Sequence, residues 1–87
     1  MIVLVDRSFE RDAKRLPKDA QVRVKASIEK LRNSSLQELN LTKMEGAKNA
    51  FRLRVGDYRI GLYLEGDSVV LSRVLNRKEM YRYFPKK

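Results

Sequence analysis

Hydrophobic and polar residues alternate most strictly in the middle of the chain, over residues 51–63. Apolar side chains occupy every second position there, on both sides of the pair Gly56-Asp57. Such alternation is typical of strands with one buried face, and a Gly-Asp pair between two such runs is typical of a two-residue hairpin turn. The turn predicts the register, with the cross-strand pairs Val55–Tyr58, Arg54–Arg59, Leu53–Ile60 and Arg52–Gly61.

The first third of the chain predicts a strand followed by two helices. The β-branched run from Ile2 to Val5 predicts a short first strand. Apolar residues at helical spacing then predict a helix that Pro17 ends. A second helix is expected from Lys18 to Leu31. The buried positions are Phe9, Ala13 and Leu16 in the first helix, and Ala20, Val24, Ile28 and Leu31 in the second.

The remaining chain predicts a connection and a further strand. Four apolar residues in a polar background predict an irregular or short helical connection: Leu36, Leu39, Leu41 and Met44. A second turn, Gly66-Asp67, predicts a strand from Ser68 to Leu75. The expected partners of Tyr63, Gly61 and Arg59 on this strand are Val70, Ser72 and Val74. This register turns Arg73 toward the buried side, so either its head reaches out at the sheet end or a β-bulge shifts the register.

These elements predict one α+β domain over residues 1–87, with a short N-terminal strand, a helical hairpin and a three-stranded antiparallel meander. The helical hairpin must bury its apolar face, and the apolar face of the sheet is the largest candidate. We therefore expect the helices on one face of a single sheet that includes the first strand. The other face is expected to be open and basic.

The polar face of the predicted hairpin carries three arginines beside Gly61. A single arginine there would be an ordinary solvent-facing residue that also discourages aggregation of strand edges. Arg54 and Arg59 are directly opposed, however, and like charges across a ladder destabilise a sheet. Guanidinium groups bind phosphates well. The pattern thus favours an anion site formed by Arg52, Arg54 and Arg59 on a bare glycine floor.

Composition narrows the partner and the chemistry. The 20 basic and 11 acidic residues give a formal net charge of +9, which indicates a polyanion or an acidic protein as partner. The chain has no His and no Cys, and its acidic residues show no ligand spacing, so we expect no metal and no cofactor. The N-terminal apolar run is too short for a signal peptide and no stretch could span a bilayer, so a cytoplasmic protein without membrane contact is expected.

RNA cleavage without a metal needs an activated 2′-OH, stabilised charge on the phosphorane and a proton for the leaving 5′-oxygen. Arginine suits the second task but is a poor proton donor, because its pKa lies above about 12. The candidates left for proton transfer are Tyr81, Glu79, Glu45, Lys43 and Lys78. In the basic and aromatic segment from 76 to 85, we expect Phe84 to pack and Tyr81 to be available as a site residue.

Two segments resemble the RelE/ParE superfamily of bacterial and archaeal type II toxins: FRLRVGDYRIGLY at 51–63 and VVLSRVLNRKEMY at 69–81. The pattern R-x-R-V-G-D-Y-R followed by R-x-x-x-Y is fairly specific. The resemblance covers nearly the whole chain, including the lead-in Lys43-Met44-Glu45-Gly46, and is closest to the RelE branch. It implies a toxin that enters the ribosomal A site and cuts mRNA. A cognate, RelB-like antitoxin would hold it inactive in a heterodimer or heterotetramer.

The resemblance also implies the site residues. In RelE-like members, basic hairpin residues polarise the scissile phosphate, and an Arg and a Tyr near the C-terminus complete the site. The implied catalytic residues are Arg54, Arg59, Arg77 and Tyr81, and the implied RNA- or phosphate-binding residues are Arg52, Lys43, Asn76 and Lys78. Several relatives carry Lys at positions 52 and 54, and many carry His at position 76, where Asn cannot act as an acid or a base.

Two other functions stay open at the level of sequence. The ParE branch keeps the same hairpin but poisons DNA gyrase without cutting RNA. A basic module could also bind nucleic acid without chemistry, because charge alone gives sequence-independent affinity. The ending with Arg77 and Tyr81 favours the RelE branch.

Overall fold

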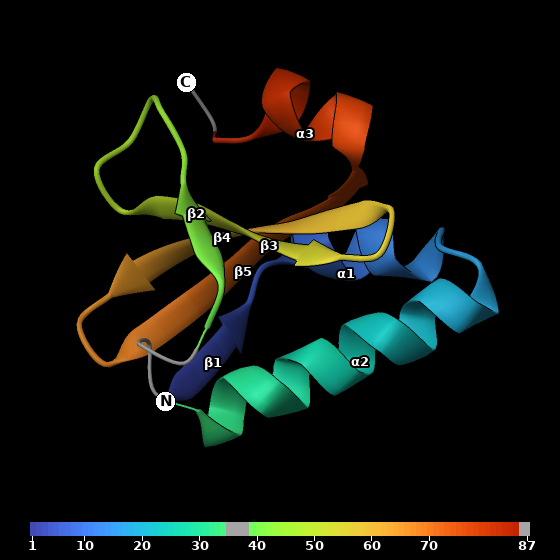
Figure 1. The fold of residues 1–87 in the computed structure, drawn as a ribbon, viewed down its shortest axis with the longest axis horizontal. Coiled ribbons are helices and arrows are strands. Elements are labelled where there is room, and N and C mark those ends of the chain that lie inside the picture. The colour runs from blue at the N-terminus through green and yellow to red at the C-terminus, as the bar shows by residue number, and fades with distance from the viewer. Residues whose placement is uncertain (35–38, 86–87) are drawn as a thin grey trace.

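The computed structural model describes residues 1–34 and 39–85 (Figure 1). Within them the elements are β1 (Ile2–Val5), α1 (Arg7–Lys14), α2 (Lys18–Asn33), β2 (Leu41–Lys43), β3 (Ala50–Val55), β4 (Tyr58–Glu65), β5 (Ser68–Asn76) and α3 (Arg77–Tyr83). The strands form one five-stranded sheet in the order β1-β5-β4-β3-β2. β1 runs parallel to β5, and the other neighbours are antiparallel. The predicted α+β class is confirmed.

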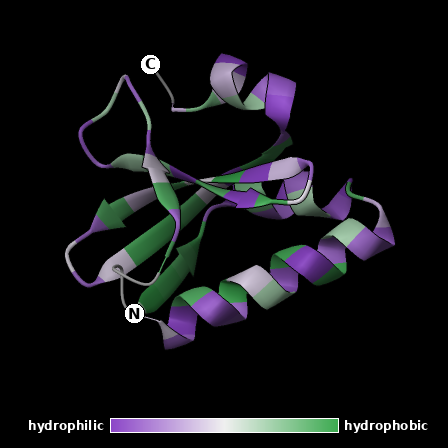
Figure 2. Ribbon diagram, viewed as in Figure 1, coloured by the Kyte–Doolittle hydropathy of each residue, from purple (hydrophilic) through white to green (hydrophobic). Residues whose placement is uncertain are grey.

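The helical hairpin covers one face of this sheet, as predicted, and buries the larger core (Figure 1). In α2 the predicted stripe is confirmed, because Ala20, Val24 and Leu31 are buried and Ile28 is half-buried. Pro17 stands at the N-cap of α2. Figure 2 shows the apolar residues of α2 recurring along the helix between hydrophilic ones.

Two parts of the fold differ from the sequence-based expectation. The connection before the hairpin was expected to be irregular or helical, but Leu41–Lys43 form the edge strand β2 on β3. Three residues are too few to show a strand pattern, so the free edge of β3 decides their structure. Leu36 lies outside the described residues. The second difference is α3, which packs on the opposite sheet face, so that face is not simply open and basic (Figure 1).

The register of the central hairpin agrees with the prediction at every predicted pair, including Arg54 opposite Arg59. The β4–β5 pairing agrees at Tyr63 and Val70 but then shifts by one residue, so Gly61 pairs with Arg73. The expected pairs of Gly61 with Ser72 and of Arg59 with Val74 are therefore wrong. Opposite Gly61 and Leu62, β5 contains one extra residue, Ser72, and this bulge shifts the register, which confirms that alternative for Arg73.

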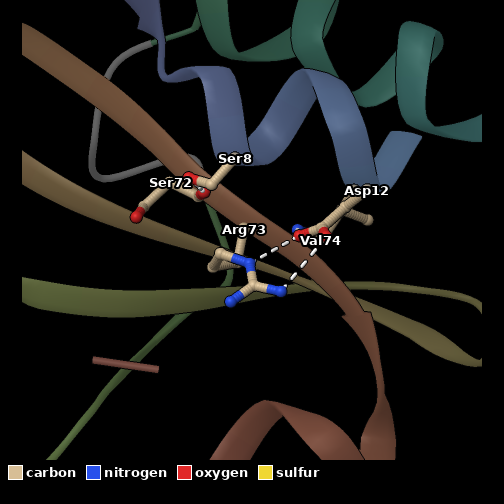
Figure 3. Close-up of polar contacts among 5 residues, drawn as sticks. All are labelled: Ser8, Asp12, Ser72, Arg73 and Val74. Carbon is tan, nitrogen blue, oxygen red and sulfur yellow. Dashed lines mark hydrogen bonds and ion pairs between the residues drawn. The ribbon is translucent and has the colours of Figure 1, made fainter. Parts of the chain in front are cut away.

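The bulge of β5 lies where β1 stops pairing with that strand. β1 pairs with β5 only as far as Leu71, and the rest of that edge faces α1. Two side chains of α1 take the place of a neighbouring strand (Figure 3). The hydroxyl of Ser8 donates to the carbonyl of Ser72 at 2.7 Å, and the carboxylate of Asp12 accepts from the backbone N–H of Val74 at 3.2 Å.

Candidate anion site

Arg59 lies at the centre of the candidate site. Its side chain was expected on an open face but is only 8% exposed. The Nη1 atom donates to the carbonyl oxygens of Gly56 at 3.0 Å and Tyr58 at 2.9 Å, which fixes the guanidinium. Burial lowers the pKa of Arg59, and the nearby charges of Arg54, Arg52 and Arg77 lower it further. Arg54, Arg52 and Arg77 are therefore close enough to Arg59 to act on its charge.

A second arginine, Arg54, also contacts the hairpin turn. Arg54 is exposed, and its Nε donates to the same Gly56 carbonyl at 3.4 Å. Gly56 has a φ of +61°, which favours glycine, and an added Cβ would lie 3.0 Å from Nη1 of Arg23. Arg23 belongs to α2, and no local sequence pattern indicates that it reaches the hairpin.

Tyr81 meets Arg52 across the face of the sheet. The Nη1 atom of Arg52 donates a hydrogen bond to the Tyr81 hydroxyl, and the guanidinium carbon lies 5.1 Å from the ring centroid. Tyr81 is 62% exposed, as expected for a site residue. Both side chains line a cleft of about 510 Å³ whose other walls are Lys43, Met44, Glu45, Gly46, Phe84 and Pro85. The cleft thus holds three candidates for proton transfer, namely Tyr81, Lys43 and Glu45.

Of the other predicted RNA-binding residues, two form hydrogen bonds within the protein and one is exposed. The ammonium of Lys43 donates to the carbonyl of Met44 at 2.7 Å and also to that of Ala47, so it holds the turn after β2. Asn76 caps α3: its Oδ1 accepts from the backbone N–H of Glu79 at 2.9 Å, and its Nδ2 donates to the Glu79 carboxylate at 2.9 Å. Asn76 and Glu79 are thus paired with each other. Lys78 is exposed on α3.

The predicted bare glycine floor is wrong, because Phe84 covers Gly61. A Cβ added at Gly61 would lie 2.7 Å from two carbons of the Phe84 ring. Phe84 is 2% exposed and packs with Met80, Leu75 and Ala50 in a second, smaller core, which confirms its predicted packing role. The absence of a side chain at Gly61 therefore leaves room for the Phe84 ring, whose packing holds α3 against the sheet. The backbone N–H of Arg77 also donates to Asp57 at 3.3 Å, which ties the start of α3 to the hairpin turn.

The described residues also bear on two other kinds of site, metal sites and membrane-spanning helices. No group of three or more His, Cys, Asp or Glu side chains in residues 1–34 and 39–85 is placed to hold a metal ion. In the same part of the chain, no helix has the length and apolar character needed to cross a membrane.

Comparison with known proteins then decides the family. Residues 3–81 match the family model described as the ParE toxin of the type II toxin-antitoxin system parDE. The chain belongs to the RelE/ParE superfamily of toxins. It is 44% identical over 88 residues to Toxin RelE3 of Methanocaldococcus jannaschii, covering 98% of this chain and 100% of that toxin. The RelE-named relative favours the RelE branch of the superfamily over the ParE alternative.

Solved structures of the superfamily have the same fold. The RelB-RelE antitoxin-toxin complex of Methanococcus jannaschii matches with a TM-score of 0.77 and 39% identity, over 94% of this chain and 99% of that one. The RelE-RelB complex of Pyrococcus horikoshii matches with a TM-score of 0.71 and 20% identity, over 87% of this chain and 93% of that one. The second match shows the fold alone. Together with the family match, these findings make the chain a type II toxin.

Proposed function

We propose that this toxin is a ribosome-dependent endoribonuclease that cuts mRNA with its own cations instead of a metal ion. The observation that carries the proposal is the gathering of Arg52, Arg54 and Arg77 around the buried Arg59, with Tyr81 hydrogen-bonded to Arg52. The RelE name of the 44% identical relative supports the same branch. Cytoplasmic localisation is part of the proposal, because that is where the ribosomes are.

The arginines would stabilise the charge that develops on the phosphorane. A guanidinium carries five N–H donors, and the two carbonyl bonds of Arg59 use only two of them. These bonds hold the group in place before the substrate arrives, which is the condition for effective electrostatic stabilisation. Arg54 and Arg77 would bind the neighbouring phosphate oxygens. Removing one such donor in other enzymes slows turnover by about 100- to 1,000-fold.

Tyr81 is the proposed proton donor to the leaving 5′-oxygen. Arg52 donates to the Tyr81 oxygen, so the hydroxyl keeps its own proton for a ligand in the cleft. Glu45 lines the same cleft and is the proposed base that takes the proton of the 2′-OH, and the Lys43 ammonium is proposed to bind a phosphate oxygen there. Lys78 and Asn76 are proposed as further RNA contacts, although Asn76 already caps α3. Such a site depends on substrate alignment, so we expect poor activity on free RNA and better activity when the ribosome holds the RNA in line.

Primer extension on a translated mRNA tests this proposal. Codon-phased cuts are expected with ribosomes and purified toxin, and not on the same RNA alone. Arg54→Ala and Tyr81→Phe should remove the cuts, whereas Arg32→Ala should not, because Arg32 pairs with Glu29 on α2 away from the site. Cuts on free RNA would contradict ribosome dependence. Intact mRNA together with DNA damage in arrested cells would establish the ParE activity instead.

We also propose that a RelB-like antitoxin places an acidic amphipathic helix between α1 and α2. A groove of about 470 Å³ lies there, with apolar walls that include Phe9, Ala13, Val22 and Ile28. Val22 is 67% exposed, and Lys14, Lys18 and Lys25 line the groove as well. A helix with an apolar face and acidic flanks fits this combination. The related M. jannaschii and P. horikoshii toxins were solved as complexes with RelB, and a one-to-one or two-to-two assembly is expected here.

We expect the antitoxin gene to lie beside this one, and co-expression with a small protein from a neighbouring reading frame tests the antitoxin proposal. The tagged toxin should retain that protein, and Val22→Asp should weaken the complex by burying a carboxylate in the interface. Lys30→Gln also lowers the net charge by one, at a position of α2 outside the groove, and serves as the control. Equal affinity of both variants would contradict this placement of the helix.

A further inference from the structure

A buried carboxylate outside the anion site supports the strand that leads into α3. Asp12 on α1 is only 7% exposed and faces the half of β5 beyond the end of β1, on the edge opposite β4. Its Oδ2 atom accepts from Nε of Arg73 at 2.7 Å, and its Oδ1 atom accepts from Nη2 at 3.1 Å (Figure 3). The backbone N–H of Val74 is a third donor to the same group. One carboxylate thus fixes both the backbone and the side chain at the bulge of β5.

The ion pair is strong by its geometry. The two N–H bonds from Arg73 are the paired contact that a planar guanidinium makes with a carboxylate. This hydrogen bonding raises the pKa of Arg73 against the opposing effect of partial burial, so its guanidinium stays charged. Removing one partner of such a pair leaves a charge without compensation, which is more disruptive than losing an exposed ion pair.

The pair connects the two layers that lie on opposite faces of the sheet. Asp12 belongs to α1, while the guanidinium carbon of Arg73 lies 5.7 Å from the ring centroid of Tyr83 on α3. β5 ends at Asn76 and α3 begins at Arg77, so no linker separates them. A shift of β5 at Arg73 would therefore pass directly into the first turn of α3.

We propose that Asp12 is a positioning residue that acts through Arg73 on α3 and thereby sets Tyr81 against Arg52. The inference rests on the proposed nuclease function for its effect on cleavage. Arg52, Arg54 and Arg59 stand on β3 and β4, away from the edge that Asp12 supports. Loss of the Asp12 charge should thus leave the RNA contacts of these hairpin arginines in place, weaken binding through Arg77 and Lys78 only slightly, and chiefly impair the step that needs Tyr81.

Asp12→Asn is the informative variant, because it removes the charge but keeps an oxygen that can accept from Val74. We expect kcat for ribosome-dependent cleavage to fall by about 10- to 100-fold, as for a small misplacement of a reacting group, while KM rises by no more than about threefold. Arg73→Lys should show the same split, because lysine keeps the charge but not the paired contact.

A double-mutant cycle separates positioning from general destabilisation. If Asp12 acts through Tyr81, Asp12→Asn should add little to the loss caused by Tyr81→Phe, whereas its effect should multiply with that of Arg54→Ala. Val24→Ala is the control, because this buried residue of α2 does not contact α3, and its effect should multiply in both backgrounds. Equal fold losses from Asp12→Asn in the two backgrounds would overturn the proposal.

Amide hydrogen exchange tests the same inference without any cleavage. We expect Asp12→Asn to speed exchange in α3, including the Phe84 amide that bonds to Met80 at 3.0 Å, by at least about tenfold, while α2 stays unchanged. Unchanged exchange in α3 would overturn the positioning role. If the wild-type toxin made no cuts, the proposed function would fail, and exchange would still decide whether Asp12 holds α3.

Discussion

The two faces of the sheet have different compositions and different tasks. The face toward α1 and α2 is dry and apolar, with Ile60, Leu62 and Leu71 all 0% exposed. The face toward α3 combines a small core around Phe84 with the buried guanidinium of Arg59. The larger apolar core therefore lies on one face of the sheet, and the clustered arginines lie on the other.

This separation explains how the chain tolerates opposed like charges. Arg59 is partly desolvated and lies near three other arginines, and both effects oppose its charged form. Strain of this kind concentrates at functional sites, where the rest of the fold compensates for it. The apolar face supplies that compensation, so changes on the two faces should have different consequences.

The largest loss of stability is expected from Leu62→Ala on the apolar face. Leu62 is fully buried, so the change should lower the free energy of unfolding by about 3–5 kcal/mol through lost transfer and an unfilled cavity. Urea denaturation measures this. Val22→Ala, at a position that is 67% exposed, should change stability by less than about 0.5 kcal/mol. A similar loss in both variants would refute the assignment of the main core to this face.

Gly61→Ala should have an intermediate effect, and it acts on the other face. The added Cβ would lie 2.7 Å from the Phe84 ring, so the ring and α3 must move. We expect a loss of about 1–3 kcal/mol in stability from overpacking, together with loss of cleavage as Tyr81 leaves Arg52. Gly66→Ala is the control: its φ of +58° makes alanine strained, but nothing lies within 4 Å, so stability should fall while cleavage persists. Full cleavage by Gly61→Ala would show that α3 need not sit on the glycine.

Arg59→Met should separate activity from stability. Because the pKa of Arg59 is lowered in the folded protein, its charge costs stability at every pH below that pKa, which includes all working conditions. Methionine fills similar volume without charge, so we expect unfolding free energy within about 1 kcal/mol of the wild type but cleavage reduced at least about 100-fold. Thermal melts with inorganic phosphate provide a second readout. Phosphate should raise the Tm of the wild type more than that of the variant, and equal shifts would contradict an anion site at Arg59.

The hairpin could be predicted from sequence because its register depends on local pattern and turn residues alone. The bulge in β5 could only be offered as an alternative, because it depends on Asp12, which is 61 residues away from Arg73 in the sequence. The contact between Arg52 and Tyr81 spans 29 residues and depends on where α3 packs. That packing in turn depends on Phe84 fitting against Gly61, which no periodicity reveals. The sequence therefore predicted which residues form the site. It could not predict how their side chains lie relative to one another, because that depends on long-range packing.

The smallest effect is expected from removing the charge of one exposed lysine. Doing so on each side of the sheet in turn compares the two faces most directly. Lys78→Gln on α3 should reduce affinity for ribosome-bound mRNA only a few-fold. The slope of log affinity against log salt should fall by about 0.7–0.9, because one phosphate contact is lost. Lys25→Gln on α2 removes the same charge from the opposite side of the sheet and should leave the slope unchanged. Filter binding over a salt series measures both slopes. Equal changes would mean that RNA responds to the net charge of +9 rather than to the face that carries Arg59.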